Sequence, residues 1–134
     1  IVAEEGVPVS VGAYGAKIVY YGSEIVLNYE TEPPMGDFIF SAKLPLLNRE
    51  IPFWMYGRNL VFLDAYYVLV EKVEKKTWDP ITTVIINIHT GKYASLGNWY
   101  TDISVENDVV LKNRFDGNSM TLKDVDDLNW ITIE

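Results

Sequence analysis

Apolar and polar residues alternate along most of this chain with the two-residue period of a β-strand. Leu60 and Phe62, for example, would lie on one face of a strand, and the apolar residue that follows each of them would lie on the other. Residues 81–88 (Ile-Thr-Thr-Val-Ile-Ile-Asn-Ile) are apolar at nearly every position, which predicts a central strand buried on both faces. The pattern therefore favours strands over helices.

Turn-forming residues divide this pattern into about eleven or twelve short strands at intervals near ten residues. Gly22-Ser23 is a two-residue link between two of them, as in a β-hairpin. The pattern predicts an all-β class and a single domain over residues 1–134, built as a sandwich, a barrel or an assembly of four-stranded sheets. The predicted strands are residues 7–11, 17–21, 25–29, 38–42, 60–63, 66–73, 81–88, 93–96, 102–106, 109–112, 119–123 and 130–133.

Two segments are less regular. Residues 43–54 contain Pro45 and Pro52, so we expect them to be mostly irregular. In residues 66–73 a helix competes with a strand, because Glu71 and Lys75 are four residues apart and could pair on a helical surface. We favour the strand, because β-branched and aromatic residues dominate the segment and no helix cap precedes it.

The charge of the chain is strongly negative and uneven. It has 19 acidic and 11 basic residues among 134, a net charge of −8. Residues 1–32 carry a net −4 and residues 101–134 a net −5, whereas the middle of the chain carries +1. Such a field repels nucleic-acid phosphates and anionic membranes, and it attracts a basic partner. We therefore expect neither nucleic acid nor a membrane among the direct partners.

The chain carries few groups with catalytic chemistry. It has no cysteine, which excludes thiol catalysis, disulfides and cysteine-bound zinc, and its one histidine, His89, is expected in a turn. The turn Asp116-Gly117-Asn118 and the acids Asp124, Asp126 and Asp127 do not match a calcium-binding loop. We therefore expect no metal, no cofactor and no enzymatic activity. A small hydrolase would need two close carboxylates in a pocket, one of them with a raised pKa.

One part of the chain resembles a known architecture. Residues 59–64, 66–73 and 83–88, followed by Thr90-Gly91-Lys92, resemble one blade of a β-propeller, in which an apolar strand ends in such a turn and the chain returns as the outer strand. About twelve strands would make three blades, a half-propeller of three small sheets. A small, acidic, half-propeller-like chain resembles the immunity proteins of bacterial contact-dependent growth inhibition systems. The resemblance implies an antitoxin that binds and blocks a toxin domain, commonly a nuclease.

A nuclease cleft is lined with Lys and Arg, because it must bind phosphates. An inhibitor can fill that cleft with carboxylates where the phosphates would lie, with aromatic side chains as anchors. On this interpretation the partner is a basic protein toxin, and its binding residues are acids near aromatics at loops and strand ends. The candidates are Trp78, Asp79, Trp99, Tyr100, Asp102, Glu106, Asp108, Asp124, Asp126 and Asp127.

The aromatic residues leave a second function open. Four Trp and nine Tyr either fill the core or form a recognition surface. A carbohydrate-binding or surface-associated β domain would place such rings coplanar on one exposed face. No stretch of 18 apolar residues occurs, and the first residues lack the basic start and apolar run of a signal peptide, so we expect a cytoplasmic location.

Overall fold

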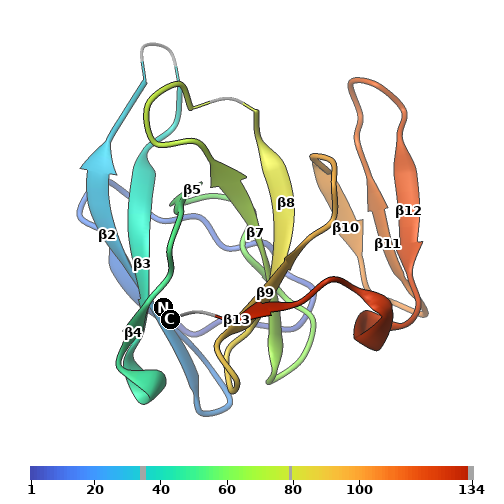
Figure 1. Cartoon of the computed structure of the whole chain (residues 1–134), viewed down its shortest axis with the longest axis horizontal. Helices are drawn as coiled ribbons and strands as arrows, with labels where there is room; N and C mark the ends of the chain where they lie inside the picture. Colours follow the sequence, from blue (N-terminus) through green and yellow to red (C-terminus); the bar gives the residue numbers. More distant parts are fainter. Residues whose placement is uncertain (34–35, 79, 133–134) are drawn as a thin grey trace.

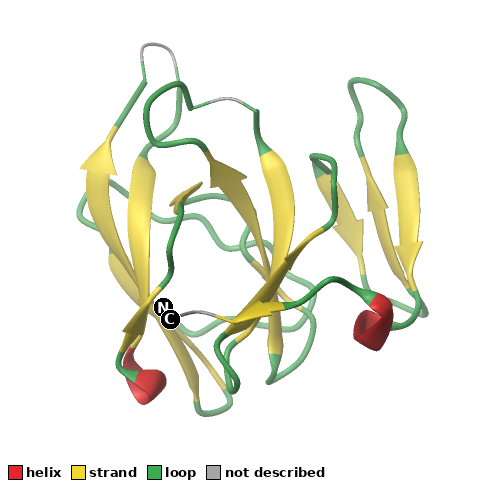
Figure 2. Cartoon of the chain, viewed as in Figure 1, coloured by secondary structure: helices red, strands yellow, loops and turns green. Residues whose placement is uncertain are grey.

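The structure, a computed structural model, describes residues 1–33, 36–78 and 80–132. These residues form antiparallel β-structure with two single-turn 3₁₀ helices, so the all-β prediction is confirmed (Figures 1 and 2). The strands are β1 (Ala16–Tyr20), β2 (Ser23–Thr31), β3 (Ile39–Leu44), β4 (Arg49–Glu50), β5 (Trp54–Tyr56), β6 (Val61–Phe62), β7 (Tyr67–Val73), β8 (Thr82–Asn87), β9 (Lys92–Ser95), β10 (Asp102–Ser104), β11 (Val109–Lys112), β12 (Ser119–Leu122) and β13 (Ile131–Thr132). The 3₁₀ helices are η1 (Pro45–Leu47) and η2 (Val125–Asp127).

The described strands form two sheets. The larger follows the order β1-β2-β3-β5-β7-β8-β9-β13, with β4 added beside β3 and β6 beside β7, and the smaller follows β10-β11-β12. The larger sheet curls around a core, and the smaller lies outside it, beyond β8 and β9 (Figure 1). No pairing between β1 and β13 is found in the described part of the chain, so the curled sheet stays open.

The strands do not divide into three small sheets, as the propeller resemblance implied. The blade-like segment does form a four-stranded meander, β6 to β9. The strand β7, however, is long enough to pair with β6 near its start and with β5 near its end. Because β5 continues the pairing into β3 and β2, the meander joins one large sheet instead of ending as a blade.

The predicted hairpin between the first two long strands is present, with its turn one residue earlier than expected. Tyr20 pairs with Ser23, so the turn residues are Tyr21 and Gly22. Both have positive φ, 41° and 82°, as a type I′ turn requires. Gly22, at the second position of the turn, adopts a positive φ without strain. A positive φ is uncommon for a residue such as Tyr21 at the first position.

Two segments that contain proline are less regular than their neighbours, which was expected for residues 43–54 but not for residues 7–11. Residues 43–54 contribute the end of β3, η1, the two-residue β4 and the start of β5. The predicted strand at residues 7–11 is reduced to a single antiparallel bridge between Val9 and Leu60. Pro8 has no N–H to donate to a neighbouring strand, which limits the pairing of this segment.

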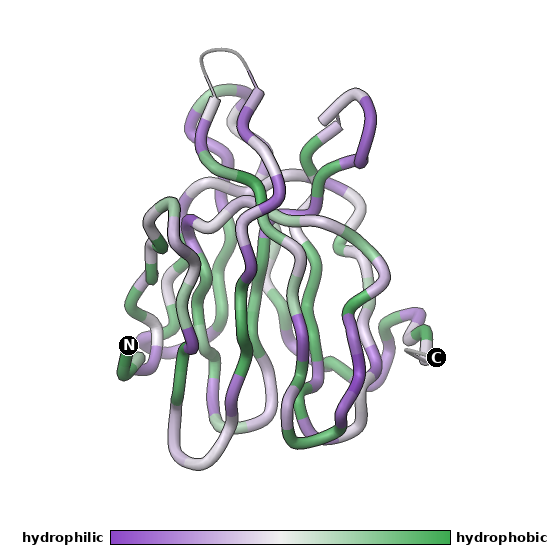
Figure 3. Tube along the Cα trace, turned by 90° about the vertical axis from the view of Figure 1, so that its left-hand side faces the viewer, coloured by the Kyte–Doolittle hydropathy of each residue, from purple (hydrophilic) through white to green (hydrophobic). Residues whose placement is uncertain are grey.

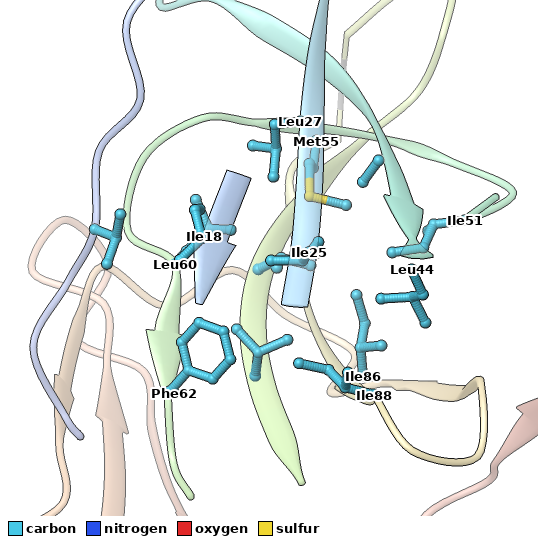
Figure 4. Close-up of a cluster of buried hydrophobic side chains, with 14 of the residues drawn as sticks. Ile18, Ile25, Leu27, Leu44, Ile51, Met55, Leu60, Phe62, Ile86 and Ile88 are labelled. Atoms are coloured by element: carbon cyan, nitrogen blue, oxygen red, sulfur yellow. The ribbon is translucent and has the colours of Figure 1, made fainter. Parts of the chain in front are cut away.

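Hydrophobic residues are spread along the strands of the molecule (Figure 3). Their buried side chains form two main cores. Inside the curl, Leu60, Phe62 and Ile86 belong to the principal core (Figure 4). Val61 and Ile85, on the opposite face of the same strands, pack in a second core with Leu69, Ala94, Tyr100, Leu111 and Leu122. The second core fixes the small sheet against the outer face of the large one. As predicted, β8 is buried on both faces.

A third, smaller cluster lies on the outer face of β3, β5 and β7. Ile39, Tyr56 and Val73 form its buried part, with Trp54, Trp78 and Ile81 packed against them.

Candidate functional site

Turns from distant parts of the sequence meet at one end of the molecule, the lower end in Figure 1. A side chain at Gly6 would collide with Val105, and the Gly6 N–H donates to the Phe62 carbonyl at 2.9 Å. These contacts bring the turn at residues 4–6, the end of β6 and the β10–β11 loop together. Because Val109 pairs with Leu122, the segment that follows β12 lies at the same end of the small sheet.

This region carries an excess of carboxylates, and we call it the acidic end. All of its acids are exposed except Asp64, which is half-buried. Within the described part of the chain, none of them forms an ion pair with Lys or Arg. Two bases lie close to these acids: Lys123 follows β12, and Lys92 at the start of β9 lines a pocket together with Asp126. The acids are Glu4, Glu5, Asp64, Glu106, Asp108, Asp124, Asp126 and Asp127.

Two tyrosines show that acids from separate turns act on the same groups. Burial raises the pKa of Tyr20, and the negative charges of Glu5 and Asp64 raise it further. Burial also raises the pKa of Tyr67, and here Asp126 and Asp64 add to the effect. Asp64 therefore acts on both hydroxyls, which places the carboxylates of three turns in one field.

These shifts predict a loss of stability at high pH. In the unfolded chain both hydroxyls lose their protons near pH 10.0, whereas in the folded chain they do so only at a higher pH. Their contribution is fully present below about pH 10 and is lost as the pH rises through the folded pKa values, because the unfolded state then binds fewer protons. Urea midpoints measured between about pH 8 and about pH 11 should fall. The fall should be smaller in a variant with Tyr20→Phe and Tyr67→Phe, and an equal fall in both proteins would contradict the assignment.

Exposed aromatic rings accompany the carboxylates. Tyr21 is 85% exposed at the tip of the β1–β2 hairpin, and its ring meets that of Tyr20 edge-on at 4.8 Å. Tyr66 is 54% exposed in the β6–β7 turn, and its ring centroid lies 4.7 Å from that of His89. Rings that rest on neighbouring rings lose little further freedom on binding, which suits them as anchors.

His89 joins the hairpin turns of this end. Its Nε2 lies 2.9 Å from the Ala65 carbonyl oxygen and 3.1 Å from Ser23 Oγ, and the Ser23 hydroxyl donates to the same carbonyl. The β8–β9 turn is thereby tied to the β6–β7 turn and to the β1–β2 hairpin. The histidine lies in a turn, as predicted, and its ring bonds to the backbone of another turn.

The structure separates the ten predicted partner-binding residues into several groups. Five of them, Glu106, Asp108, Asp124, Asp126 and Asp127, lie at the acidic end. Asp102 and Trp99 lie toward the opposite end of the small sheet, where Asp102 forms an ion pair with Arg114 at 2.8 Å. Tyr100 is buried in the second core, and Trp78 packs in the third cluster. Asp79 lies outside the described residues.

Tyr100 is a correction to the predicted surface. Its side chain faces the large sheet, and its N–H donates to Thr83 Oγ1 at 2.9 Å. Trp99 next to it contributes instead to an open pocket. Neighbouring residues in extended chain point to opposite sides, so only one of these two aromatics can be exposed.

The sequence did not identify Glu4, Glu5, Asp64, Tyr21 and Tyr66 as site residues. The acidity of Glu4 and Glu5 is visible in the sequence, since residues 1–32 carry a net charge of −4. The sequence does not reveal the contact between Gly6 and Val105, which are about a hundred residues apart in the chain. This contact brings Glu4 and Glu5 close to the acids of the last third of the chain.

A buried charge network forms a second polar centre. Glu71, only 3% exposed in the middle of β7, accepts hydrogen bonds from Arg58 Nε at 2.8 Å, Asn59 Nδ2 at 3.2 Å and Trp99 Nε1 at 3.0 Å. Arg58 also pairs with Asp37. Burial lowers the pKa of Arg58, but its hydrogen bonds and charge interactions with the two carboxylates outweigh this and raise it. The network connects the large sheet to the segment that leads into the small one.

Among the described residues, no three His, Cys, Asp or Glu side chains are grouped so that they could hold a metal ion. No helix in the same ranges is both long and apolar enough to cross a membrane. Comparisons with protein-family models, with curated proteins and with solved structures give no match. The function is therefore argued from the geometry of this chain.

Proposed function

We propose that this chain is a non-enzymatic binding domain that docks a basic protein on its acidic end, as an immunity protein docks the toxin domain it blocks. The proposal depends chiefly on one observation. Eight acids from four separated segments gather at one end without an ion pair to any described Lys or Arg. A surface of this kind favours a partner that supplies the missing positive charges.

The physical consequences of such a surface are rapid and salt-sensitive association. A concentrated negative field steers a basic partner toward the acidic end before contact. The exposed rings of Tyr21 and Tyr66 then supply apolar contact area beside the carboxylates. If the partner is a nuclease, the carboxylates would occupy the positions that phosphates take in its cleft.

The hydrogen bonds of two side chains, Glu71 and His89, favour a binding domain over a hydrolase. The most buried carboxylate, that of Glu71, already accepts three hydrogen bonds and is held in place by them. The imidazole of His89 is engaged with Ser23 and the Ala65 carbonyl. Both groups act as links between structural elements, which is the role that a rigid binding domain requires of them.

The direct test uses the purified product of the gene immediately upstream of this chain. Titration calorimetry should give tight 1:1 binding, with an affinity that falls strongly between about 50 and about 500 mM NaCl. If that protein has a nuclease activity, stoichiometric addition of this chain should abolish it. Absence of binding, or an affinity that does not change with salt, would contradict the proposal.

Neutralising part of the acidic end should weaken this complex. The variant Glu106→Gln, Asp126→Asn and Asp127→Asn removes three charges and should lower the association rate constant about tenfold, measured by stopped-flow fluorescence at low salt. The matched control removes three charges elsewhere, with Glu30→Gln, Glu32→Gln and Glu74→Gln, and should change the rate much less. Equal effects of the two variants would show that only total charge matters and that the acidic end is not the docking surface.

A further inference from the structure

An open pocket of about 410 Å³ lies beside the buried Glu71 network, at the end of the small sheet opposite to the acidic end. Trp99 and Phe115 form one wall, with ring centroids 5.8 Å apart and planes inclined by 23°. Phe115 lies in the turn between β11 and β12, and its side chain is 74% exposed. A stacked ring pair with one exposed member is a ready contact surface for a ligand.

The loop that carries Phe115 is held rigidly. Asn113 is buried, and its Nδ2 donates to the Trp99 carbonyl at 2.9 Å. Its Oδ1 accepts from the N–H groups of Phe115 at 2.8 Å and Asp116 at 3.2 Å. The Arg114 N–H donates to Thr101 Oγ1 at 3.0 Å. The buried amide thus holds the backbone at both Trp99 and Phe115, which pre-organises the segments that carry the two rings.

The charges around the pocket are compensated. Arg58 pairs with Glu71 and Asp37, and Arg114 pairs with Asp102. Each guanidinium that lines the pocket is thus already paired with a carboxylate, so the pocket offers polar groups without an unpaired charge that would select an ion. The hydrogen bonds described for Asn59 use its amide nitrogen, which leaves the Oδ1 acceptor for a ligand.

We propose that this pocket binds a saccharide, with a sugar ring resting on Trp99 and Phe115 and its hydroxyls bonded to Ser10, Asn59 and Arg114. A sugar ring presents an apolar C–H face, which packs on aromatic rings, and an edge of hydroxyls, which both donate and accept. The pocket supplies hydrogen-bond partners for such hydroxyls. The Ser10 hydroxyl can donate and accept, Oδ1 of the Asn59 side chain can accept, and the Arg114 guanidinium can donate. Its volume lies in the range of small-molecule sites, about 300–1,000 Å³.

This inference is independent of the acidic end and of its partner. It also differs from the predicted platform of several coplanar aromatics. Trp54, Trp78 and Trp130 pack against hydrophobic clusters, and Trp99 is the tryptophan that lines this pocket. The site is thus a pocket for one or two rings, formed by one indole, one phenyl ring and a polar rim.

The test is a titration of the ¹⁵N-labelled chain with glucose, galactose, mannose and N-acetylglucosamine, each to about 50 mM, with the indole N–H signals as reporters. At least one sugar should shift the Trp99 signal saturably and leave those of Trp54, Trp78 and Trp130 in place. No shift with any of the four sugars would overturn the proposal. A shift of the Trp99 signal by sulfate, without one by any sugar, would overturn it in favour of an anion site.

Matched variants locate the binding. Phe115→Ala removes a largely exposed ring and should weaken the sugar about fivefold or more. Tyr66→Ala removes an exposed ring at the acidic end and should leave the affinity for the sugar unchanged. If both variants or neither weaken the sugar, the ring pair is not the binding wall and the proposal is wrong.

Discussion

Replacing Glu71 with alanine is expected to lower the free energy of unfolding by about 3 kcal/mol. The change leaves the side-chain donors of Asn59 and Trp99 without their carboxylate and leaves Arg58 with Asp37 alone. An unsatisfied buried donor costs about 1–3 kcal/mol, and Arg58 is two-thirds shielded from solvent. Urea denaturation of the purified variant measures the loss.

Two further variants separate the network from general effects of losing an acid. Glu71→Gln keeps a carbonyl oxygen that can accept some of the bonds, so it should cost less than Glu71→Ala. Glu74→Ala removes an exposed acid three residues along the chain and should change the stability by about 0.5 kcal/mol or less. Similar losses for Glu71→Ala and Glu74→Ala would show that the buried network does not hold the two sheets together.

Phe62→Ala should lower the free energy of unfolding even more than Glu71→Ala, by about 4 kcal/mol. Phe62 is fully buried in the principal core and stacks on Tyr20 with centroids 5.3 Å apart. Truncation removes the buried ring and leaves a cavity that the surrounding strands, paired on both sides, can close only in part. Thermal or urea unfolding measures the loss.

The matched control is the same substitution at an exposed phenylalanine. Phe115→Ala removes a largely exposed ring that stacks on Trp99, so it should cost about 1 kcal/mol or less. If Phe115→Ala destabilises the protein as much as Phe62→Ala, the core inside the curled sheet is not the main source of stability.

The strands from β6 to β9 could be predicted because their side chains alternate between two cores. Leu60 and Phe62 face the interior of the curl, whereas Val61 faces the small sheet. A period of two therefore identifies both the strand and its two faces. The central strand β8 could be predicted from its continuous apolar run, because Ile85 and Ile86 are buried on opposite faces.

The joining of these strands into one large sheet could not be predicted. The pairing of β5 and β6 along different parts of β7 depends on the length of β7 and on the path of the intervening loop. Alternation identifies faces but not neighbours, so a separate blade and a continuous sheet produce the same pattern.

The candidate site was predicted in part for a similar reason. The acids of the last third of the chain were visible as a group, and Glu106 and Asp126 do lie at the acidic end. The sequence does not show whether Trp99 or Tyr100 faces solvent. The extended segment around them has too few alternating apolar and polar residues to indicate which side chains point inward. In the sequence Glu71 stands out only as a possible helical partner of Lys75, because its buried role depends on the strand pairing.

If the acidic end receives a basic partner, the complex should shield the turns of this end from solvent. The most direct measurement is the exchange of backbone amide hydrogens in the chain, alone and bound to the purified product of the gene immediately upstream. Exchange should become slower in residues 4–6, 64–66, 105–108 and 123–128, with little change around residues 113–118. Protection confined to residues 113–118, or no protection at the acidic end in a saturated complex, would contradict it.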